Sequence, residues 1–178
     1  MIKTNLLQGE RVSLRAMEPE DLEVLYTLEN DTTLWDISSV NVPYSRYLLK
    51  QFIAKGTHDI YTDGQLRLMI ESTEEGTVVG MADIVDFNPR HLRAEIGIVL
   101  AHDYQKKGYG REVLELMEKY VQEFLHLHQL YSYVSTSNDA SIKLFLRAGY
   151  QQTCLLKDWL YIGNTYTDTI IFQKIFAK

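Results

Sequence analysis

The 178-residue sequence contains one cysteine, three prolines and no long apolar run. The single cysteine, Cys154, excludes an internal disulfide framework and suits a reducing compartment. No run approaches the roughly 18 to 20 apolar residues of a membrane span, and the first residues do not lead into the apolar core of a signal peptide. We therefore expect a soluble, cytoplasmic protein with no membrane partner.

Basic residues are fewer than acidic ones: the sequence has 18 Lys and Arg residues and 24 Asp and Glu residues, which gives a formal net charge of −6. This balance argues against general nucleic-acid binding and favours cationic partners only weakly. Proline and glycine are too scattered for a disordered linker. A composition of 46% hydrophobic and 24% charged residues is that of a globular protein, and we expect one domain over residues 1–178.

The N-terminal third of the chain combines one strand with two helices. Residues 11–16 alternate their side chains and predict a strand, and residues 18–21 open a helix whose face includes Leu22, Leu25 and Tyr26. Residues 31–43 are apolar but lack a clear period. Residues 44–55 return to helical spacing, with Gly56 placed to end that helix.

Strands dominate the rest of the chain. Residues 66–71, 77–87 and 93–100 predict an antiparallel meander, and an amphipathic helix follows over residues 111–124. After a strand at residues 130–135, Asn138 caps a short helix that Gly149 ends, and residues 150–161 and 166–174 form a hairpin. The fold class is therefore α+β, with a mixed, mostly antiparallel twisted sheet of about six or seven strands and about four helices.

A glycine-rich loop at residues 105–111 joins the strand at residues 93–100 to the long helix. This order aims unpaired backbone N–H groups and the positive end of the helix dipole at one point, and Gly108 and Gly110 allow a close backbone approach. The loop lacks the Lys-Ser/Thr ending of a nucleoside-triphosphate loop, and no dinucleotide-binding βαβ half follows. The loop suits another anion, although glycines at such joints can also serve only to turn the chain.

Together with residues 94–100 before the loop and residues 138–150 after it, the sequence resembles the GNAT family of N-acetyltransferases. The resemblance covers nearly the whole chain. Residues 88–95 are similar to the bacterial spermidine N-acetyltransferases, and the chain also resembles the ribosomal-protein N-terminal acetyltransferases. The resemblance implies a GNAT fold with acetyl-CoA as cosubstrate and no metal. It also implies a homodimer or higher homo-oligomer.

The resemblance further implies which residues bind acetyl-CoA. The loop would hold the pyrophosphate, the strand before it would pair with the pantetheine arm, and the later helix would flank the thiol. The pyrophosphate residues are Gln105, Lys106, Lys107, Gly108, Tyr109, Gly110 and Arg111. The pantetheine residues are Ile98, Val99 and Leu100, and the residues beside the thiol are Asn138, Ser141 and Phe145. A backbone N–H near Val99 or Leu100 would stabilise the negative carbonyl oxygen.

Acetyl transfer needs a neutral amine, yet an alkylammonium with a pKa near 10.4 is neutral only about once in 2,500 molecules at pH 7. Glu95 is the predicted proton acceptor, because it lies on the strand that leads to the reacting carbonyl. The alternative is a structural carboxylate paired with Arg93. Other acids could bind a cationic acceptor if they converge, namely Asp83, Asp86, Glu29, Asp31 and Asp36.

The general acid of the family is a tyrosine in the second motif helix, and this chain has Phe145 at that position. Three explanations stay open: another phenol such as Tyr150, Tyr104 or Tyr109 donates the proton, the thiolate leaves unassisted, or no transfer occurs. We expect an acetyl-CoA-dependent N-acetyltransferase acting on a primary amine, either a polyamine-like molecule or a peptide N-terminus. The alternative is an acyl-CoA-binding or sensing domain with little turnover.

Overall fold

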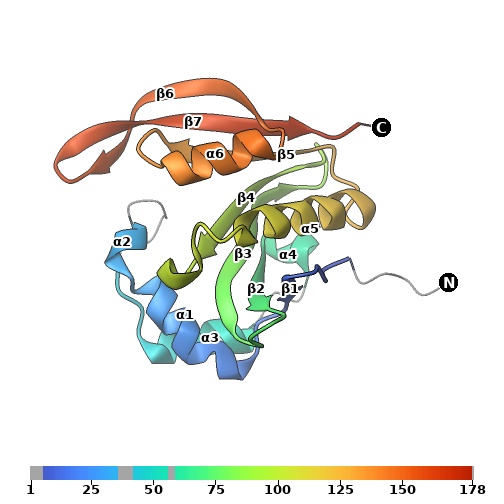
Figure 1. Cartoon of the computed structure of the whole chain (residues 1–178), viewed down its shortest axis with the longest axis vertical. Helices are drawn as coiled ribbons and strands as arrows, with labels where there is room; N and C mark the ends of the chain where they lie inside the picture. Colours follow the sequence, from blue (N-terminus) through green and yellow to red (C-terminus); the bar gives the residue numbers. More distant parts are fainter. Residues whose placement is uncertain (1–5, 36–41, 56–58, 178) are drawn as a thin grey trace.

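The computed structural model describes residues 6–35, 42–55 and 59–177. One seven-stranded sheet has the order β1-β2-β3-β4-β5-β7-β6 (Figure 1). Its strands are β1 (Val12–Arg15), β2 (Leu66–Ser72), β3 (Val78–Asn88), β4 (Arg93–Leu100), β5 (Gln129–Ser135), β6 (Gln151–Ile162) and β7 (Thr165–Ile175). All neighbours are antiparallel except β4 and β5, which are parallel. The expected α+β class with a mixed sheet is confirmed.

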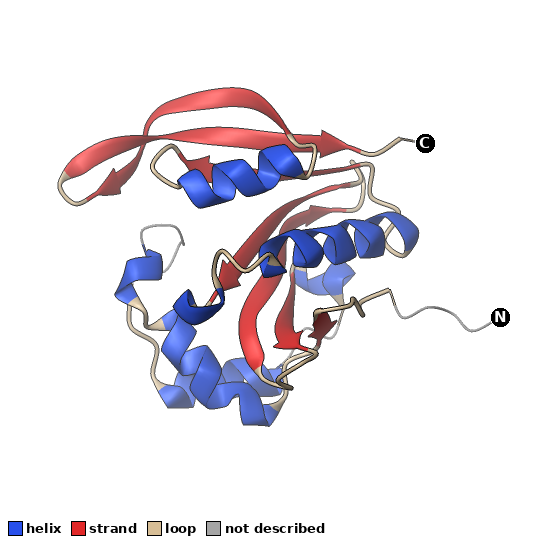
Figure 2. Cartoon of the chain, in the orientation of Figure 1, coloured by secondary structure: helices blue, strands red, loops and turns tan. Residues whose placement is uncertain are grey.

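Helices cover both faces of this sheet (Figure 2). They are α1 (Leu22–Glu29), α2 (Thr32–Trp35), α3 (Arg46–Lys55), α4 (Ile60–Asp63), α5 (Tyr109–Glu123) and α6 (Asp139–Arg147), with 3-10 turns η1 (Pro19–Asp21) and η2 (His102–Tyr104). Within the described residues, no helix is long and apolar enough to cross a membrane.

Two short helices were not predicted. Helix α2 lies in a stretch predicted to lack periodicity, and α4 lies between two predicted elements. Each is one turn long, so neither can show a repeating apolar face. The ends of α4 have local causes, since the Asp59 side chain accepts the Tyr61 N–H and Gly64 adopts a left-handed φ of +66°. Gly56, predicted to end α3, lies outside the described residues.

The two faces of the sheet have separate cores. On one face, Ile84 and Ile96 pack with Val113 and Met117 of α5. On the other face, Met69 and Met81 pack in a second cluster with residues of α1 and α3. The alternation of side chains along each strand explains this division, because successive residues point to opposite faces. A residue's place along β4 therefore decides which face its side chain lies on.

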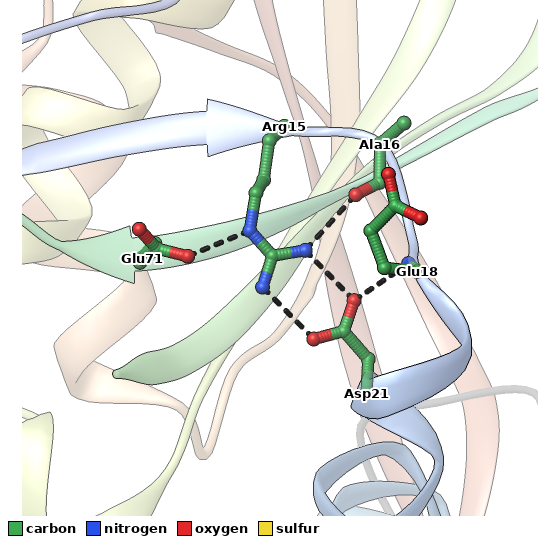
Figure 3. A network of polar contacts seen from close by, with 5 residues as sticks. All are labelled: Arg15, Ala16, Glu18, Asp21 and Glu71. Carbon is green, nitrogen blue, oxygen red and sulfur yellow. Dashed lines mark hydrogen bonds and ion pairs between the residues drawn. The ribbon is translucent and has the colours of Figure 1, made fainter. Parts of the chain in front are cut away.

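Arg15 fixes the start of the α1 region against the sheet (Figure 3). Its Nε donates to Glu71 Oε2 at 2.6 Å, and its two Nη atoms donate to both oxygens of Asp21 at 2.8 and 2.9 Å. Burial alone would raise the pKa of Asp21, but hydrogen bonds from Arg15 and from the Glu18 N–H outweigh burial and lower the pKa. The charged network therefore holds η1 and the start of α1 against β1 and β2.

Strands β4 and β5 separate soon after they meet. Residues Arg93, Ala94 and Glu95 pair with Gln129, Leu130 and Tyr131, and no pairing between these strands follows. Strand β5 continues to Ser135 alongside β7, while β4 continues to Leu100 alongside β3. The sheet therefore opens between its two middle strands.

Candidate active site

A cavity of about 880 Å³ lies where β4 and β5 separate. Its walls come from both halves of the sheet and from helices α3 and α6. Glu95 and Val99 line it from β4, Tyr133 lines it from β5, and Phe145 lines it from α6. The opening thus brings together residues that are far apart in the sequence.

The exposed edge of β4 offers backbone groups to a ligand. The Ala101 N–H donates to Val79 O at 2.9 Å, and Leu100 lies opposite Gly80. In an antiparallel ladder, alternate residues bond to the same neighbour, so Val99 bonds to β3 while Ile98 and Leu100 direct their N–H groups toward the opening. Of the two donors considered for the carbonyl oxygen, Leu100 has the required orientation.

The loop at residues 105–111 continues from this edge to the N-terminus of α5. Lys106 and Gly108 have left-handed φ values of +59° and +89°, and Gly108 occupies the N-cap position of α5 without a side-chain cap. The loop is tied to the N-terminal segment, because Arg11 Nη1 donates to Lys107 O at 2.7 Å. Within the described part of the chain, no acceptor is bonded to the amides of Gly108 and Tyr109.

These features fit acetyl-CoA. Free N–H groups at a helix start suit its pyrophosphate, and an unpaired strand edge suits the amide-bearing pantetheine arm. When bound, acetyl-CoA supplies the acetyl group. The loop itself does not line the cavity, so the acetyl end rather than the pyrophosphate would lie there.

Other predicted loop residues mainly support the loop's shape. Tyr109 is buried beneath the Arg11 guanidinium, 4.6 Å from the ring centroid. Gly110 packs beside Leu144, since an added Cβ would lie 3.4 Å from that side chain. Three further predicted side chains contact neighbours on or near the loop: Gln105 with Leu100 O, Lys107 with the Tyr104 ring and Arg111 with Glu115.

We expect Gly108→Ala to raise the KM for acetyl-CoA by about 10-fold with a smaller change in kcat, because a side chain at this φ is strained and an added Cβ would lie 3.0 Å from Arg11 Nη1, which holds the loop through Lys107 O. The change should be read from initial rates at varied acetyl-CoA concentration. Gly64→Ala is the matched control, since Gly64 also has a left-handed φ of +66° but nothing within 4 Å of the added Cβ. Equal KM effects in both variants would contradict a ligand-binding role for Gly108.

Glu95 lies in the cavity as a half-buried carboxylate. Arg93 does not pair with it, because the Arg93 guanidinium binds Asp86 at 3.1 Å. In the described chain, the Glu95 side chain has no hydrogen bond or ion pair. Burial and the nearby charge of Asp86 both raise the pKa of Glu95. A carboxylate with a raised pKa at a cavity wall can accept a proton from an ammonium ion.

Two of the predicted acceptor-binding acids do converge, but on an arginine. Arg67 donates Nε and Nη2 to Asp83 at 2.7 and 2.8 Å, and its Nη1 is paired with Glu29. All three line the cavity, and the guanidinium also lies 5.7 Å from the Phe52 ring centroid. Asp83 and Glu29 therefore form the cavity wall as an ion-pair cluster rather than as free carboxylates.

Two of the other predicted acids, Asp31 and Asp86, are not among the cavity-lining residues. Asp31 binds His102 at 3.0 Å and accepts the Thr33 hydroxyl and N–H, which lower its pKa. Asp86 is paired with Arg93 and with the Tyr131 hydroxyl outside the cavity lining. Asp36 lies outside the described residues. The predicted acidic set is thus divided among several places.

At the predicted thiol end, Asn138, Ser141 and Phe145 all line the cavity. The Asn138 side chain also caps α6, because its Oδ1 accepts the Ser141 N–H at 3.0 Å. Phe145 is buried, with its ring stacked on Phe172 at 5.7 Å and edge-on to Tyr150 at 4.9 Å. An aromatic ring therefore fills the tyrosine position without a hydroxyl.

The three tyrosines nearest in sequence lie elsewhere. The Tyr104 hydroxyl donates to Glu75 at 2.6 Å, and Tyr109 is buried beneath Arg11. Burial and the adjacent charge of Glu118 strongly raise the pKa of Tyr150, whose hydroxyl has no hydrogen-bond partner among the described residues. None of them is among the cavity-lining residues.

The structure adds cavity residues that the sequence did not single out. Arg67 and Phe52 lie on the α3 side, and Tyr133 and Trp159 lie on the β5 side. The sequence could have indicated Arg67 in one way, because it is a charged residue within a mostly apolar strand. Tyr133 could be placed only with the register of β4 and β5. Among the described residues, no group of three or more His, Cys, Asp or Glu could hold a metal ion.

Comparison with known proteins agrees with this geometry. Residues 11–151 match the family model described as "Acetyltransferase (GNAT) domain". The chain is 28% identical to a spermidine N(1)-acetyltransferase of Escherichia coli K12, covering 91% of this chain and 86% of that one. It is 23% identical to the putative ribosomal N-acetyltransferase YdaF of Bacillus subtilis, covering 93% and 91% of the two chains.

Solved structures show the same fold. Spermidine N-acetyltransferase from Vibrio cholerae in complex with CoA and spermine superimposes with a TM-score of 0.83 at 24% identity, covering 94% of this chain and 96% of that chain. A dodecameric structure of the Vibrio cholerae enzyme has a TM-score of 0.78 at 24% identity, with coverages of 94% and 95%. Because the family model spans most of the sequence, the chain belongs to the GNAT family and is an acetyl-CoA-dependent N-acetyltransferase.

Proposed function

We propose that this enzyme acetylates a primary amine that enters from the α1 and α3 face of the sheet and gives its proton to Glu95. The observation that carries the proposal is the half-buried, unpaired Glu95 carboxylate in the wall of the cavity. Along β4, Glu95 shares a face with Val99, which packs in the α1 and α3 cluster. Ile98 packs in the cluster on the other face.

Each group has one role in the proposed reaction. Glu95 removes a proton from the bound ammonium group, which creates the neutral amine that attacks the acetyl carbonyl. The Leu100 N–H donates a hydrogen bond to the carbonyl oxygen as that atom becomes negative. The Arg67 cluster holds β2, β3 and α1 together beside Glu95, so the acceptor wall keeps its shape.

A polyamine is the acceptor class that we propose. Three carboxylates line the cavity against two cationic side chains, so the lining carries an excess of negative charge. Tyr44, Phe52 and Trp159 add aromatic surface, which suits alkyl chains and further ammonium groups. The spermidine acetyltransferases among the relatives support this choice. A peptide N-terminus is the second candidate, supported by the ribosomal relative.

A thiol-release assay with acetyl-CoA tests the proposal. We expect the highest kcat/KM with spermidine or spermine, lower values with monoamines of matched length, and the lowest with N-terminal peptides. Mass spectrometry of the product would show a gain of one acetyl group on a primary nitrogen. Absence of thiol release with every amine, in a protein that binds CoA, would instead support a binding or sensing domain.

We also propose that copies of the chain associate through β6. This strand is one of the two edges of the sheet, opposite β1, and it is exposed along nearly its whole length. Leu155 and Tyr161 are among its large exposed side chains, and Tyr166 of β7 packs against Tyr161. Exposed apolar edges favour pairing with another chain. A monomer by light scattering at micromolar concentration would contradict this arrangement.

A further inference from the structure

We infer that Tyr133 donates the proton taken up by the departing thiolate, and so replaces the hydroxyl that Phe145 lacks. The inference rests on the proposed amine acetylation. Among the described residues that line the cavity, only Tyr44 and Tyr133 carry a phenol. Tyr44 lies at the approach to α3, where Asn30 binds both its backbone N–H and its carbonyl oxygen.

Tyr133 lies at the point where the sheet opens. Tyr131 is the last residue of β5 paired with β4, opposite Glu95. Tyr133 is two residues further, so it projects from the same face as Tyr131 and Glu95. If the pairing continued, Tyr133 would face Gly97, and no heavy atom lies within 4 Å of the place where a Gly97 side chain would begin. The opening therefore leaves space between the phenol and β4.

Tyr133 also directly follows a residue that lies beside the layer containing Phe145. Phe145 stacks on Phe172, and Phe172 lies opposite Ser132 across β5 and β7. Ser132 directly precedes Tyr133, so their side chains project from opposite faces of β5, and both residues line the cavity. The position left without a hydroxyl and the proposed donor thus reach the opening from opposite faces of the sheet, Phe145 from α6 and Tyr133 from β5.

The Tyr133 ring is held in place while its hydroxyl stays available. The ring stacks on Trp159 at 6.4 Å with an interplanar angle of 8°, and meets the Tyr131 ring edge-on at 5.9 Å. In the described chain no group is hydrogen-bonded to the Tyr133 hydroxyl. With 43% of the residue exposed, solvent reaches the ring. These properties suit a donor that must be recharged in each turnover.

The proposed step balances without another reactant. When the bond between the carbonyl carbon and sulfur breaks, the sulfur keeps the electron pair and takes the phenol proton. The resulting phenolate regains a proton from water. Protons lost by the amine leave through Glu95 to solvent, so the net products are the acetylated amine, the free thiol and one proton.

A competing role for Tyr133 is cation binding, because stacked Tyr133 and Trp159 rings could hold an ammonium group. Tyr133→Phe separates the two roles, since it keeps the ring and removes only the O–H group. Loss of the donor should lower kcat by about 100-fold and leave the KM for spermidine within about threefold of wild type. Tyr61→Phe, which removes the hydroxyl of an exposed tyrosine that does not line the cavity, should retain wild-type kcat.

A second variant restores a hydroxyl at the other side of the opening. Tyr133→Phe combined with Phe145→Tyr should recover kcat by at least about 10-fold over Tyr133→Phe alone. Rates are read by thiol release with spermidine, and CoA affinity by calorimetry confirms that each variant folds and binds. An unchanged kcat in Tyr133→Phe, a rise in KM alone, or no recovery in a double variant that still binds CoA would overturn the inference. Wild-type protein that releases no thiol with any amine would overturn the proposed function instead.

Discussion

Glu95→Gln should lower kcat at neutral pH by about 10²- to 10³-fold, because glutamine keeps the shape of the side chain but cannot accept the ammonium proton. The loss should shrink as the pH rises toward the pKa of the amine, since more of the acceptor is then already neutral. Thiol-release rates between pH 6 and pH 10 would show this convergence. An equal loss at every pH would contradict a role as a base.

The raised pKa of Glu95 gives this variant a second expected property. Burial and Asp86 favour the protonated carboxyl in the folded protein, so the stability contributed by Glu95 is present below its unfolded pKa and is lost as the pH rises through its folded pKa. Glu95→Gln should therefore raise Tm relative to wild type at pH 7 and change it less at pH 4. Asp86→Asn is the companion test. Removing the Asp86 charge should lower the pKa of Glu95, so the pH below which the reaction rate falls should be lower than in wild type.

Arg67→Gln should be the most destabilising of these changes. The substitution leaves the carboxylates of Asp83 and Glu29 in the cavity wall without their shared cation. Breaking a buried ion pair from one side costs about 3 kcal/mol or more, which for a domain of this size corresponds to a fall in Tm of roughly 6 to 12 °C. Thermal unfolding followed by circular dichroism at pH 7 measures the change.

Arg46→Gln is the matched control for Arg67→Gln. Arg46 also binds a carboxylate, that of Glu23 at 2.9 Å, and also lies over an aromatic ring, that of Tyr26 at 3.8 Å. Both members of that ion pair are exposed, so solvent screens the interaction and Tm should change little. Similar Tm values for the two variants would show that the Arg67 cluster contributes no more than a surface pair.

The sequence predicted the parts of the site that depend on local pattern. The loop at residues 105–111 lies between a strand and a strongly amphipathic helix, and both patterns are long enough to read. The placement of Gly108 at the start of α5 follows from that order. The family resemblance rested on the same segments, which is why the fold and cosubstrate were predictable.

The partners of charged residues were not predictable, because they depend on register between strands. Arg93 and Glu95 are two residues apart on β4, yet Arg93 binds Asp86 instead, where an irregularity in β3 gives Asp86 a φ of +46°. Arg67 meets Asp83 only because β2 and β3 pair in that register. Neither ion pair can be predicted from the residues next to it in the sequence. The sequence therefore identified the candidate acidic residues but did not show which of them are paired with an arginine.

The brief pairing of β4 with β5 means that the sheet is incomplete at its centre. Just three residue pairs join the two strands, and beyond them Ile98 and Leu100 present an unpaired edge. If the pantetheine arm lies along that edge, acetyl-CoA becomes a removable strand that joins the N-terminal and C-terminal halves. The same amides that bind the arm would then exchange with solvent deuterium quickly in the empty enzyme and slowly in the loaded one. Cosubstrate binding and completion of the protein's own hydrogen bonding would be one event.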